Sequence, residues 1–280
     1  MCRWFHKACD ACFIPSDAIR KVAKRLGLGD DQIRQHGLPV RPSFWQTPRP
    51  RDELVNELGL DPNRKTVLIV GGGDGIGSLG EIVEQTANEL GAHLPDGAQV
   101  VAVCGKNDIL RAQLEATEFE NVQVQVCGFV KQMSDYMEVA DVLVTKAGPG
   151  TIAEAAIRGL PTMLSSYLPG QEAGNVPFVV QSGFGEYSGK PKVIARTVRG
   201  WIQDPDKLKQ LQTAARAAAT PQATQKIAVD LLALLEESGG AAAVAAPEPA
   251  EATPAPPEPE PAAAASSWHA RLPDRLKIPA

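Results

Sequence analysis

Residues 65–77 read Lys65-Thr-Val-Leu-Ile-Val-Gly-Gly-Gly-Asp-Gly-Ile-Gly77 and decide the fold class of this chain. The run from Thr66 to Val70, apolar and rich in β-branched residues, is typical of a strand that is buried on both faces of a sheet. The glycines after it allow backbone N–H groups to approach a ligand, and the next helix would point its positive end at an anion. The segment therefore predicts a strand, a ligand-binding loop and a helix.

The same alternation of strand and helix continues along the chain. Short strands that alternate with helices form parallel sheets covered on both faces, so we predict an α/β fold with a Rossmann-like parallel sheet. Ligands of such sheets bind at the carboxyl ends of the strands. The predicted strands are Thr66–Val70, Gln99–Cys104, Val122–Val126, Asp141–Thr145 and Thr162–Ser165. The predicted helices are Leu79–Leu90, Asp108–Thr117, Gln132–Val139, Thr151–Arg158, Pro191–Gln203, Asp206–Ala219 and Ala223–Glu236.

Composition shifts divide the chain into four parts. Residues 1–40 contain a predicted strand, Ala11–Ile14, and a predicted helix, Asp17–Leu26. Residues 41–64 form a linker and lead-in, in which the prolines of residues 41–51 are expected to prevent regular structure. Residues 65–236 form the main domain. Residues 237–280 are a low-complexity Ala/Pro/Glu tail, which cannot bury enough apolar surface to become ordered.

Composition excludes several classes of function. A hydrophobic content of 44% and an aromatic content of 5% fit a globular protein with an aliphatic core. The net charge of −5 argues against nucleic acid as a partner. No apolar run approaches the ~18 residues of a membrane span, so any membrane contact should be peripheral. The five cysteines include Cys9 and Cys12 in a C-x-x-C, which without a second cluster we interpret as incidental thiols. The sequence carries no signal for an oligomeric state.

A second glycine-rich loop follows the fourth predicted strand and reads Thr145-Lys-Ala-Gly-Pro-Gly-Thr-Ile-Ala-Glu154. The N–H groups of Gly150 and Thr151, with the Thr151 hydroxyl, can cradle an anion, and Lys146 can add charge. Glu154 lies one turn further along the helix, where its carboxylate can reach a vicinal diol. The alternative is that Thr151 and Glu154 form a capping box and bind nothing.

A third loop, after the fifth strand, contains Gln171, Glu172 and Asn175. Amide and carboxylate groups together suit the hydroxyls of a sugar ring, whereas the alternative is a solvent loop with an asparagine cap. The first loop matches G-x-G-x-x-G at Gly75–Gly80, but no acidic residue ends the second strand, so the dinucleotide interpretation is weak. Asp204-Pro-Asp206 is a literal D-x-D, which we interpret as a helix cap.

Together these motifs resemble the plant and algal monogalactosyldiacylglycerol synthases, from about residue 4 to residue 234. The resemblance implies the C-terminal domain of a GT-B glycosyltransferase of family 28, preceded by a remnant of the N-terminal domain. It implies transfer of galactose from UDP-galactose to diacylglycerol, with inversion, by a protein bound peripherally to the chloroplast envelope membrane. The motifs are Gly37-Leu-Pro-Val-Arg-Pro-Ser-Phe44, Gly71-Gly-Gly-Asp-Gly-Ile-Gly77, Cys104-Gly-Lys-Asn107, Gly128-Phe-Val130, Thr145–Ala155 and Tyr167–Val176.

The resemblance also assigns roles to residues. The uracil would be held by backbone groups of Phe129 and Val130, and the ribose hydroxyls by Glu154. The remaining donor-binding residues are Gly72, Gly73 and Gly75 in the first loop, Gly148, Pro149, Gly150 and Thr151 around the diphosphate, and Gln171, Glu172 and Asn175 around the galactose. No metal and no cofactor is expected for the transfer.

The general base remains unassigned. An inverting transfer needs a base that accepts the proton of the acceptor hydroxyl, and none of His6, His36, His93 and His269 matches the family's catalytic histidine. We expect that histidine in an N-terminal acceptor domain, of which this chain carries only the end. Two alternatives stay open: a donor-binding module that works with a separate acceptor-domain chain, and an NAD-dependent dehydrogenase.

Overall fold

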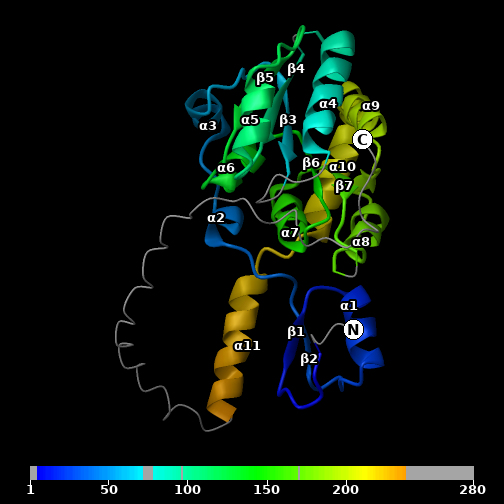
Figure 1. The fold of residues 1–280 in the computed structure, drawn as a ribbon. Helices are drawn as coiled ribbons and strands as arrows, with labels where there is room; N and C mark the ends of the chain where they lie inside the picture. Colours follow the sequence, from blue (N-terminus) through cyan, green and yellow to red (C-terminus); the bar gives the residue numbers. More distant parts are fainter. Residues whose placement is uncertain (1–4, 72–77, 96, 170, 238–280) are drawn as a thin grey trace, which may run out of the picture. The chain divides into compact units, whose positions relative to one another are not determined.

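A computed structural model describes residues 5–71, 78–95, 97–169 and 171–237 of the 280-residue chain (Figure 1). The chain divides into two compact units, residues 1–232 and residues 233–280. Within the second unit only the end of a helix, up to residue 237, is described. Residues 238–280 of the predicted tail therefore lie outside the described residues.

The first unit contains a six-stranded sheet whose strands are all parallel, in the order β5-β4-β3-β6-β7-β8. This is the order of a doubly wound sheet, in which the chain builds outward in one direction from β3 and then in the other. It confirms the predicted Rossmann-like fold. The strands are β3 Lys65–Val70, β4 Ala98–Val103, β5 Gln123–Cys127, β6 Val142–Lys146, β7 Thr162–Ser166 and β8 Gly185–Tyr187.

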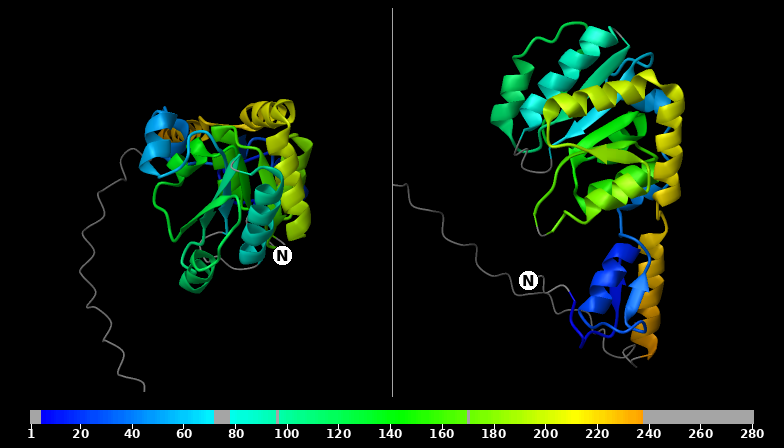
Figure 2. Two further views of the ribbon diagram at one scale, coloured as in Figure 1. Left: turned by 90° about the horizontal axis from the view of Figure 1, so that it is seen from above. Right: turned by 90° about the vertical axis from the view of Figure 1, so that its right-hand side faces the viewer.

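Helices cover both faces of this sheet (Figure 2). Alternate residues of a strand point to opposite faces, so β3 contributes to two cores: Val67 and Ile69 belong to one, and Leu68 to the other. All three side chains are at most 1% exposed. The covering helices are α4 Leu79–His93, α5 Asp108–Glu115, α6 Met133–Val139, α7 Pro149–Arg158, α8 Asn175–Gln181, α9 Pro191–Gln203 and α10 Pro205–Ala218.

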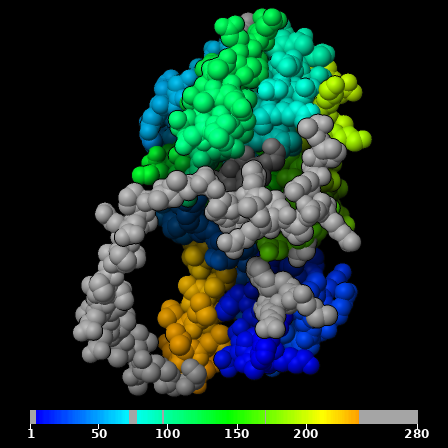
Figure 3. Space-filling model, in the orientation of Figure 1, coloured from blue at the N-terminus to red at the C-terminus, as the bar shows by residue number. Residues whose placement is uncertain are grey.

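Small residues allow close packing of these helices. A Cβ on Gly80 would lie 2.9 Å from a methyl carbon of Leu110, so α4 and α5 approach each other closely at this point. Figure 3 shows the two helices, cyan and green, side by side on one face of the molecule. The close approach places the amino-terminal ends of α4 and α5 together at the carboxyl edge of the sheet.

The prediction that residues 41–51 lack regular structure is wrong, because Pro42–Trp45 form a short helix, α2. Proline is tolerated at the first position of a helix, where its missing N–H would have no helical partner. Phe44 is 1% exposed in the core on the face of the sheet opposite Val67, and the Trp45 indole N–H donates to the Val40 carbonyl at 3.1 Å. Burial of the aromatic ring therefore fixes this segment against the main domain.

Three further elements were not predicted. α3, Arg51–Glu57, buries Leu54 and Val55 against the same core as Phe44. α8, Asn175–Gln181, contains Pro177 in its first turn and follows the polar third loop, and β8, Gly185–Tyr187, has three residues, too few for a period to emerge. The predicted cap of α10 is confirmed, because the Asp204 carboxylate accepts the Lys207 N–H at 2.9 Å.

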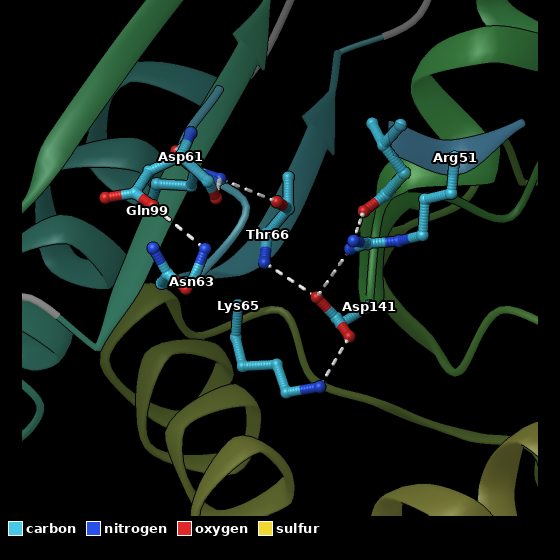
Figure 4. Close-up of polar contacts among 8 residues, drawn as sticks. Arg51, Asp61, Asn63, Lys65, Thr66, Gln99 and Asp141 are labelled. Carbon is cyan, nitrogen blue, oxygen red and sulfur yellow. Dashed lines mark hydrogen bonds and ion pairs between the residues drawn. The ribbon is translucent and has the colours of Figure 1, made fainter. Parts of the chain in front are cut away.

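A polar network closes the amino-terminal edge of the sheet (Figure 4). The Asp141 carboxylate, 7% exposed as a residue, accepts the Thr66 N–H at 2.8 Å and the Lys65 ammonium at 3.0 Å. Gln99 donates to the Asp61 carbonyl and to the Thr66 hydroxyl, each at 3.0 Å. The network ties β3, β4 and β6 together at the edge opposite the ligand loops.

The first 40 residues contain a parallel pair of short strands, β1 Cys12–Ile14 and β2 Ile33–Gln35, joined through the helix α1 Asp17–Arg25. The last helix, α11 Ala223–Glu237, contacts the end of this segment. His36 Nε2 lies 2.6 Å from Asp230 Oδ2, and the Val40 N–H donates to the Thr224 hydroxyl at 3.0 Å. Within the described ranges, no helix combines the length and the apolar character needed to cross a membrane.

Candidate functional site

The site lies where the order of the strands reverses, between β3 and β6. The connections after these two strands run in opposite directions along the sheet, so their loops separate and leave a crevice at the carboxyl edge. A pocket is present at this point, between the ends of β3, β6 and β7. Its lining includes Gly71, Ser78, Lys146, Ser165 and Ser166. Gly72, Gly73 and Gly75, predicted to bind the donor, lie outside the described residues.

The second loop, where the anion cradle is predicted, leads into the first turn of α7. Gly148 is the N-cap of α7, Pro149 is its first residue, and the Ile152 N–H donates to the Gly148 carbonyl at 3.0 Å. The N–H groups of Gly150 and Thr151 therefore belong to the first turn, where helical N–H groups have no partner within the helix. A Cβ on Gly150 would have open space around it. These groups are positioned to bind an anion.

The capping-box interpretation of Thr151 and Glu154 is wrong. Thr151 is the third residue of α7 and its cap is Gly148, so Glu154 lies beyond the position from which a glutamate bonds the cap N–H. The Glu154 carboxylate instead lies 3.6 Å from the Arg41 guanidinium. Burial raises the pKa of Glu154, and Arg41 opposes the shift. A half-buried carboxylate beside the cradle is thus available for a ligand hydroxyl.

The third loop folds toward the second. The Glu172 carboxylate receives the Lys146 ammonium at 2.5 Å and the Leu168 N–H at 2.9 Å. Asn175 is the first residue of α8, and its side-chain amide donates to the Ala147 carbonyl at 2.9 Å. The alternative of an asparagine cap is therefore wrong, because Gly174 is the N-cap. Gln171 is exposed next to Glu172.

The predicted base-binding segment follows β5, at the same edge of the sheet. Phe129 is 65% exposed and Val130 is partly buried. A Cβ on the preceding Gly128 would lie 3.0 Å from a guanidinium nitrogen of Arg111 on α5. A larger residue at Gly128 would therefore require the end of the Arg111 side chain to move by a few tenths of an ångström.

Two polar contacts of the site were not predicted from the sequence. Arg41 reaches Glu154 from the linker, and Lys146 pairs with Glu172. The sequence indicates Lys146 as a nearby charge but cannot place its partner, and Arg41 appears in it only within the motif Gly37–Phe44. Among the described residues, no group of three or more His, Cys, Asp or Glu side chains is arranged to hold a metal ion.

The fold and the carboxyl-edge loops define the C-terminal domain of a GT-B glycosyltransferase. The chain resembles the crystal structure of Acinetobacter baumannii MurG with a TM-score of 0.56 at 21% sequence identity, over 80% of this chain and 73% of that chain. Residues 66–226 match the model of the glycosyltransferase family 28 C-terminal domain. The chain belongs to this family.

Curated relatives lie closer in sequence. The chain is 44% identical over 243 residues to the chloroplastic monogalactosyldiacylglycerol synthase of Spinacia oleracea, covering 84% of this chain and 45% of that protein. It is 43% identical over 241 residues to monogalactosyldiacylglycerol synthase 1 of Arabidopsis thaliana, covering 84% of this chain and 44% of that protein. The chain thus spans somewhat under half the length of the curated relatives that it matches.

Proposed function

We propose that this chain provides the donor-binding half of a galactosyltransferase that forms monogalactosyldiacylglycerol from UDP-galactose and 1,2-diacylglycerol. The observation that carries the proposal is the convergence of the Gly148–Thr151 cradle, Glu154 and Glu172 at one edge of the sheet. These residues belong to a chain that is 44% identical to a synthase of this class. In this proposal Glu154 takes the ribose diol, the cradle takes the diphosphate and Glu172 takes the sugar, which is their order along a nucleotide sugar.

The nucleoside would enter from the side of β5. Backbone groups of Phe129 and Val130 suit the edge of a uracil, which carries both hydrogen-bond donors and acceptors. The ribose would follow, with its two hydroxyls donating to the Glu154 carboxylate. A carboxylate that accepts two hydroxyl protons is a strong, charge-assisted partner. Arg41 would give up part of its contact with Glu154 when the ribose binds.

The diphosphate would lie over the amino-terminal end of α7. The N–H groups of Gly150 and Thr151 and the positive end of the helix dipole favour its negative charge. The third loop would hold the galactose through Gln171 and Glu172. The Asn175 side chain would not contact the sugar. Its hydrogen bond to the Ala147 carbonyl would hold the second loop in shape next to Gly148.

Transfer of galactose with inversion also needs a general base. The acceptor hydroxyl oxygen forms a bond to C1 of galactose while the bond between C1 and the β-phosphate oxygen breaks, and UDP leaves with the electron pair. A base must take the proton of the hydroxyl. His93 ends α4 at the opposite edge of the sheet, so it is not placed to serve as that base.

We place the protein, as part of the same proposal, at the chloroplast envelope in peripheral contact with the membrane. The two relatives compared above are chloroplastic proteins by name. A diacylglycerol acceptor is a membrane lipid, so we place the transfer at the surface of the bilayer.

Two measurements on the purified 280-residue chain test the proposal. Calorimetric titration should show binding of UDP and UDP-galactose and no binding of NAD, because the first loop lacks the acidic partner of a dinucleotide. Transfer of labelled galactose to diacylglycerol in mixed micelles should then be assayed, with UDP-glucose as the matched donor. NAD binding without UDP binding would overturn the proposal. Donor binding without transfer would favour a module that needs a separate acceptor-domain chain.

A further inference from the structure

The ion pair between Lys146 and Glu172 joins the second and third loops. Lys146 Nζ lies 2.5 Å from Glu172 Oε1, and Glu172 Oε2 accepts the Leu168 N–H at 2.9 Å. The Glu172 side chain is only 8% exposed, whereas that of Lys146 is 37% exposed. Each oxygen of the Glu172 carboxylate therefore has its own hydrogen-bond donor. Of the two donors, the Lys146 ammonium belongs to the more exposed side chain.

The backbone directs Lys146 toward the pocket. Lys146 is the last residue of β6, and the pairing of β6 with β7 shifts in register between Thr145 and Lys146. Such irregularities occur next to functional sites, where they change the direction of a side chain. Lys146 lines the pocket at the strand reversal together with Ser165 and Ser166. A lysine at the end of a buried strand therefore faces a ligand crevice.

Three polar atoms surround the glycine that caps α7. A Cβ built on Gly148 would lie 3.8 Å from Glu172 Oε1, 3.9 Å from Lys146 Nζ and 3.9 Å from Thr151 Oγ1. The ammonium is therefore close to the first turn of α7, where the helix offers its N–H groups. An anion bound to that turn would be in reach of Lys146, and it would lie next to the Glu172 carboxylate.

We propose that Lys146 binds the diphosphate of the donor, and that Glu172 holds this ammonium in place while the site is empty. The inference rests on the proposed function of the site and adds a residue to it. A diphosphate beside Glu172 would be repelled unless a cation lay between them, and Lys146 is already at that position. When the donor binds, sugar hydroxyls donate to Glu172 where the ammonium had been its partner.

A competing account gives Lys146 no contact with the donor. In that account the lysine only neutralises the buried Glu172, and its removal weakens donor binding because an unpaired carboxylate then faces the phosphates. The two accounts differ in what happens when both charges are removed together. If Lys146 only neutralises Glu172, the double variant should bind UDP normally. If Lys146 binds the diphosphate, the double variant should remain weak.

The test is a double-mutant cycle on the full chain, with Lys146→Met, Glu172→Gln and the double variant titrated with UDP. UDP lacks the sugar, so the role proposed for Glu172 toward galactose does not enter. We expect Lys146→Met to weaken UDP binding about 10- to 100-fold, as for a charged hydrogen bond. Glu172→Gln should strengthen it, because Lys146 is then released to the phosphates. The double variant should stay more than threefold weaker than the wild type, although removal of the Glu172 charge restores part of the affinity lost in Lys146→Met.

Controls separate this inference from the proposed function and from misfolding. Lys131→Met, an exposed lysine after β5, should leave UDP affinity unchanged. Thermal unfolding followed by circular dichroism checks each chain, and the double variant, which leaves no buried charge unpaired, should fold even where Lys146→Met does not. A double variant within threefold of the wild type would overturn the inference, as would normal UDP affinity in Lys146→Met. Absence of UDP binding by the wild type would overturn the proposed function and this inference together.

Discussion

Arg41 Nη2 lies 3.6 Å from Glu154 Oε1, so a residue of the linker contacts the carboxylate predicted to hold the ribose. The Arg41 side chain is 64% exposed and the Glu154 side chain 15% exposed. The guanidinium also lies 5.4 Å from the centre of the Phe44 ring, which is buried. Segments far apart in the sequence therefore meet at Glu154, whose partner Arg41 is solvent-exposed and can be displaced by a ligand.

Glu154→Gln should lower UDP affinity about 10-fold or more, because hydrogen bonds to a charged group are stronger than those to an amide. The free energy of unfolding should change by less than about 1 kcal/mol, since the pair with the exposed Arg41 is screened by solvent. Calorimetry and urea unfolding measure the two quantities. Glu84→Gln, on the exposed side of α4, is the matched control. Unchanged UDP affinity would contradict the ribose role of Glu154.

The pH dependence of UDP binding should report the same carboxylate. Burial, opposed by Arg41, raises the pKa of Glu154 above its ordinary value. Ionisation is thus less favourable in the folded chain, so this group's contribution to stability is fully present below the unfolded pKa. That contribution is lost as the pH rises through the higher folded pKa. Ribose hydroxyls donate best to the ionised form.

UDP affinity should therefore fall as the pH is lowered. The fall should begin at a higher pH than it would if Glu154 had the ordinary pKa of a glutamate. Titrations of the wild type and Glu154→Gln over the same pH series isolate this effect, because both chains share the titration of the diphosphate. The ratio of the two dissociation constants should approach one at acid pH. A ratio independent of pH would assign the acid limb to another group.

Gln171→Ala should weaken the binding of UDP-galactose several-fold and leave the binding of UDP unchanged. Gln171 is exposed beside Glu172 in the third loop, where an amide can donate to or accept from a sugar hydroxyl. Its loss should cost about 1 kcal/mol, the contribution of a neutral hydrogen bond. Competition titrations with both ligands give the comparison. An equal effect on UDP would place Gln171 at the nucleotide and not at the sugar.

Much of the fold could be predicted because buried parallel strands have a strong local signal. Runs such as Thr66–Val70 are continuous, β-branched and followed by glycine, and each predicted strand is within a residue or two of a strand of the structure. α2 was missed because Pro42 was interpreted as a breaker, whereas Phe44 anchors a helix through tertiary burial. β8 has too few residues for any period to show.

The site could be predicted at the level of loops and not of contacts. Strand order brings the carboxyl ends of β3, β6 and β7 together, and these ends line one pocket. The partners of Glu154 and Glu172 depend on side chains from distant segments, and no local pattern reveals them. The capping box was a local alternative, but the N-cap of α7 is Gly148, three residues before Thr151.

Asp141→Ala should destabilise the fold without affecting the donor site. The carboxylate accepts the buried Thr66 N–H and pairs with Lys65 at the amino-terminal edge of the sheet. Leaving a buried donor without a partner costs about 1–3 kcal/mol, so the free energy of unfolding should fall by about that amount. Urea unfolding measures it, with the exposed Asp10→Ala as control. A change in UDP affinity of the folded variant would show that the two edges are coupled.

Two glycines within helices should respond in opposite directions to alanine. α4 and α9 pack against each other, and a Cβ on Gly91 of α4 would lie 2.1 Å from the Glu120 carbonyl oxygen. A Cβ on Gly200 of α9 would meet nothing within 4 Å. Alanine is the better helix former by about 0.5–1 kcal/mol, so Gly200→Ala should stabilise the chain by about that amount.

At Gly91 the gain in helix propensity is outweighed by a clash of the added methyl group with the Glu120 carbonyl oxygen. This oxygen belongs to the backbone, so it cannot rotate away as the end of a side chain can. Overpacking of this kind costs about 1–3 kcal/mol, so Gly91→Ala should lower the free energy of unfolding by about 1–2 kcal/mol after the gain in helix propensity. Urea unfolding of both variants and the wild type gives the comparison. Equal stabilisation of the two variants would mean that the loop at Glu120 moves freely away from α4, and that this close approach does not constrain the fold.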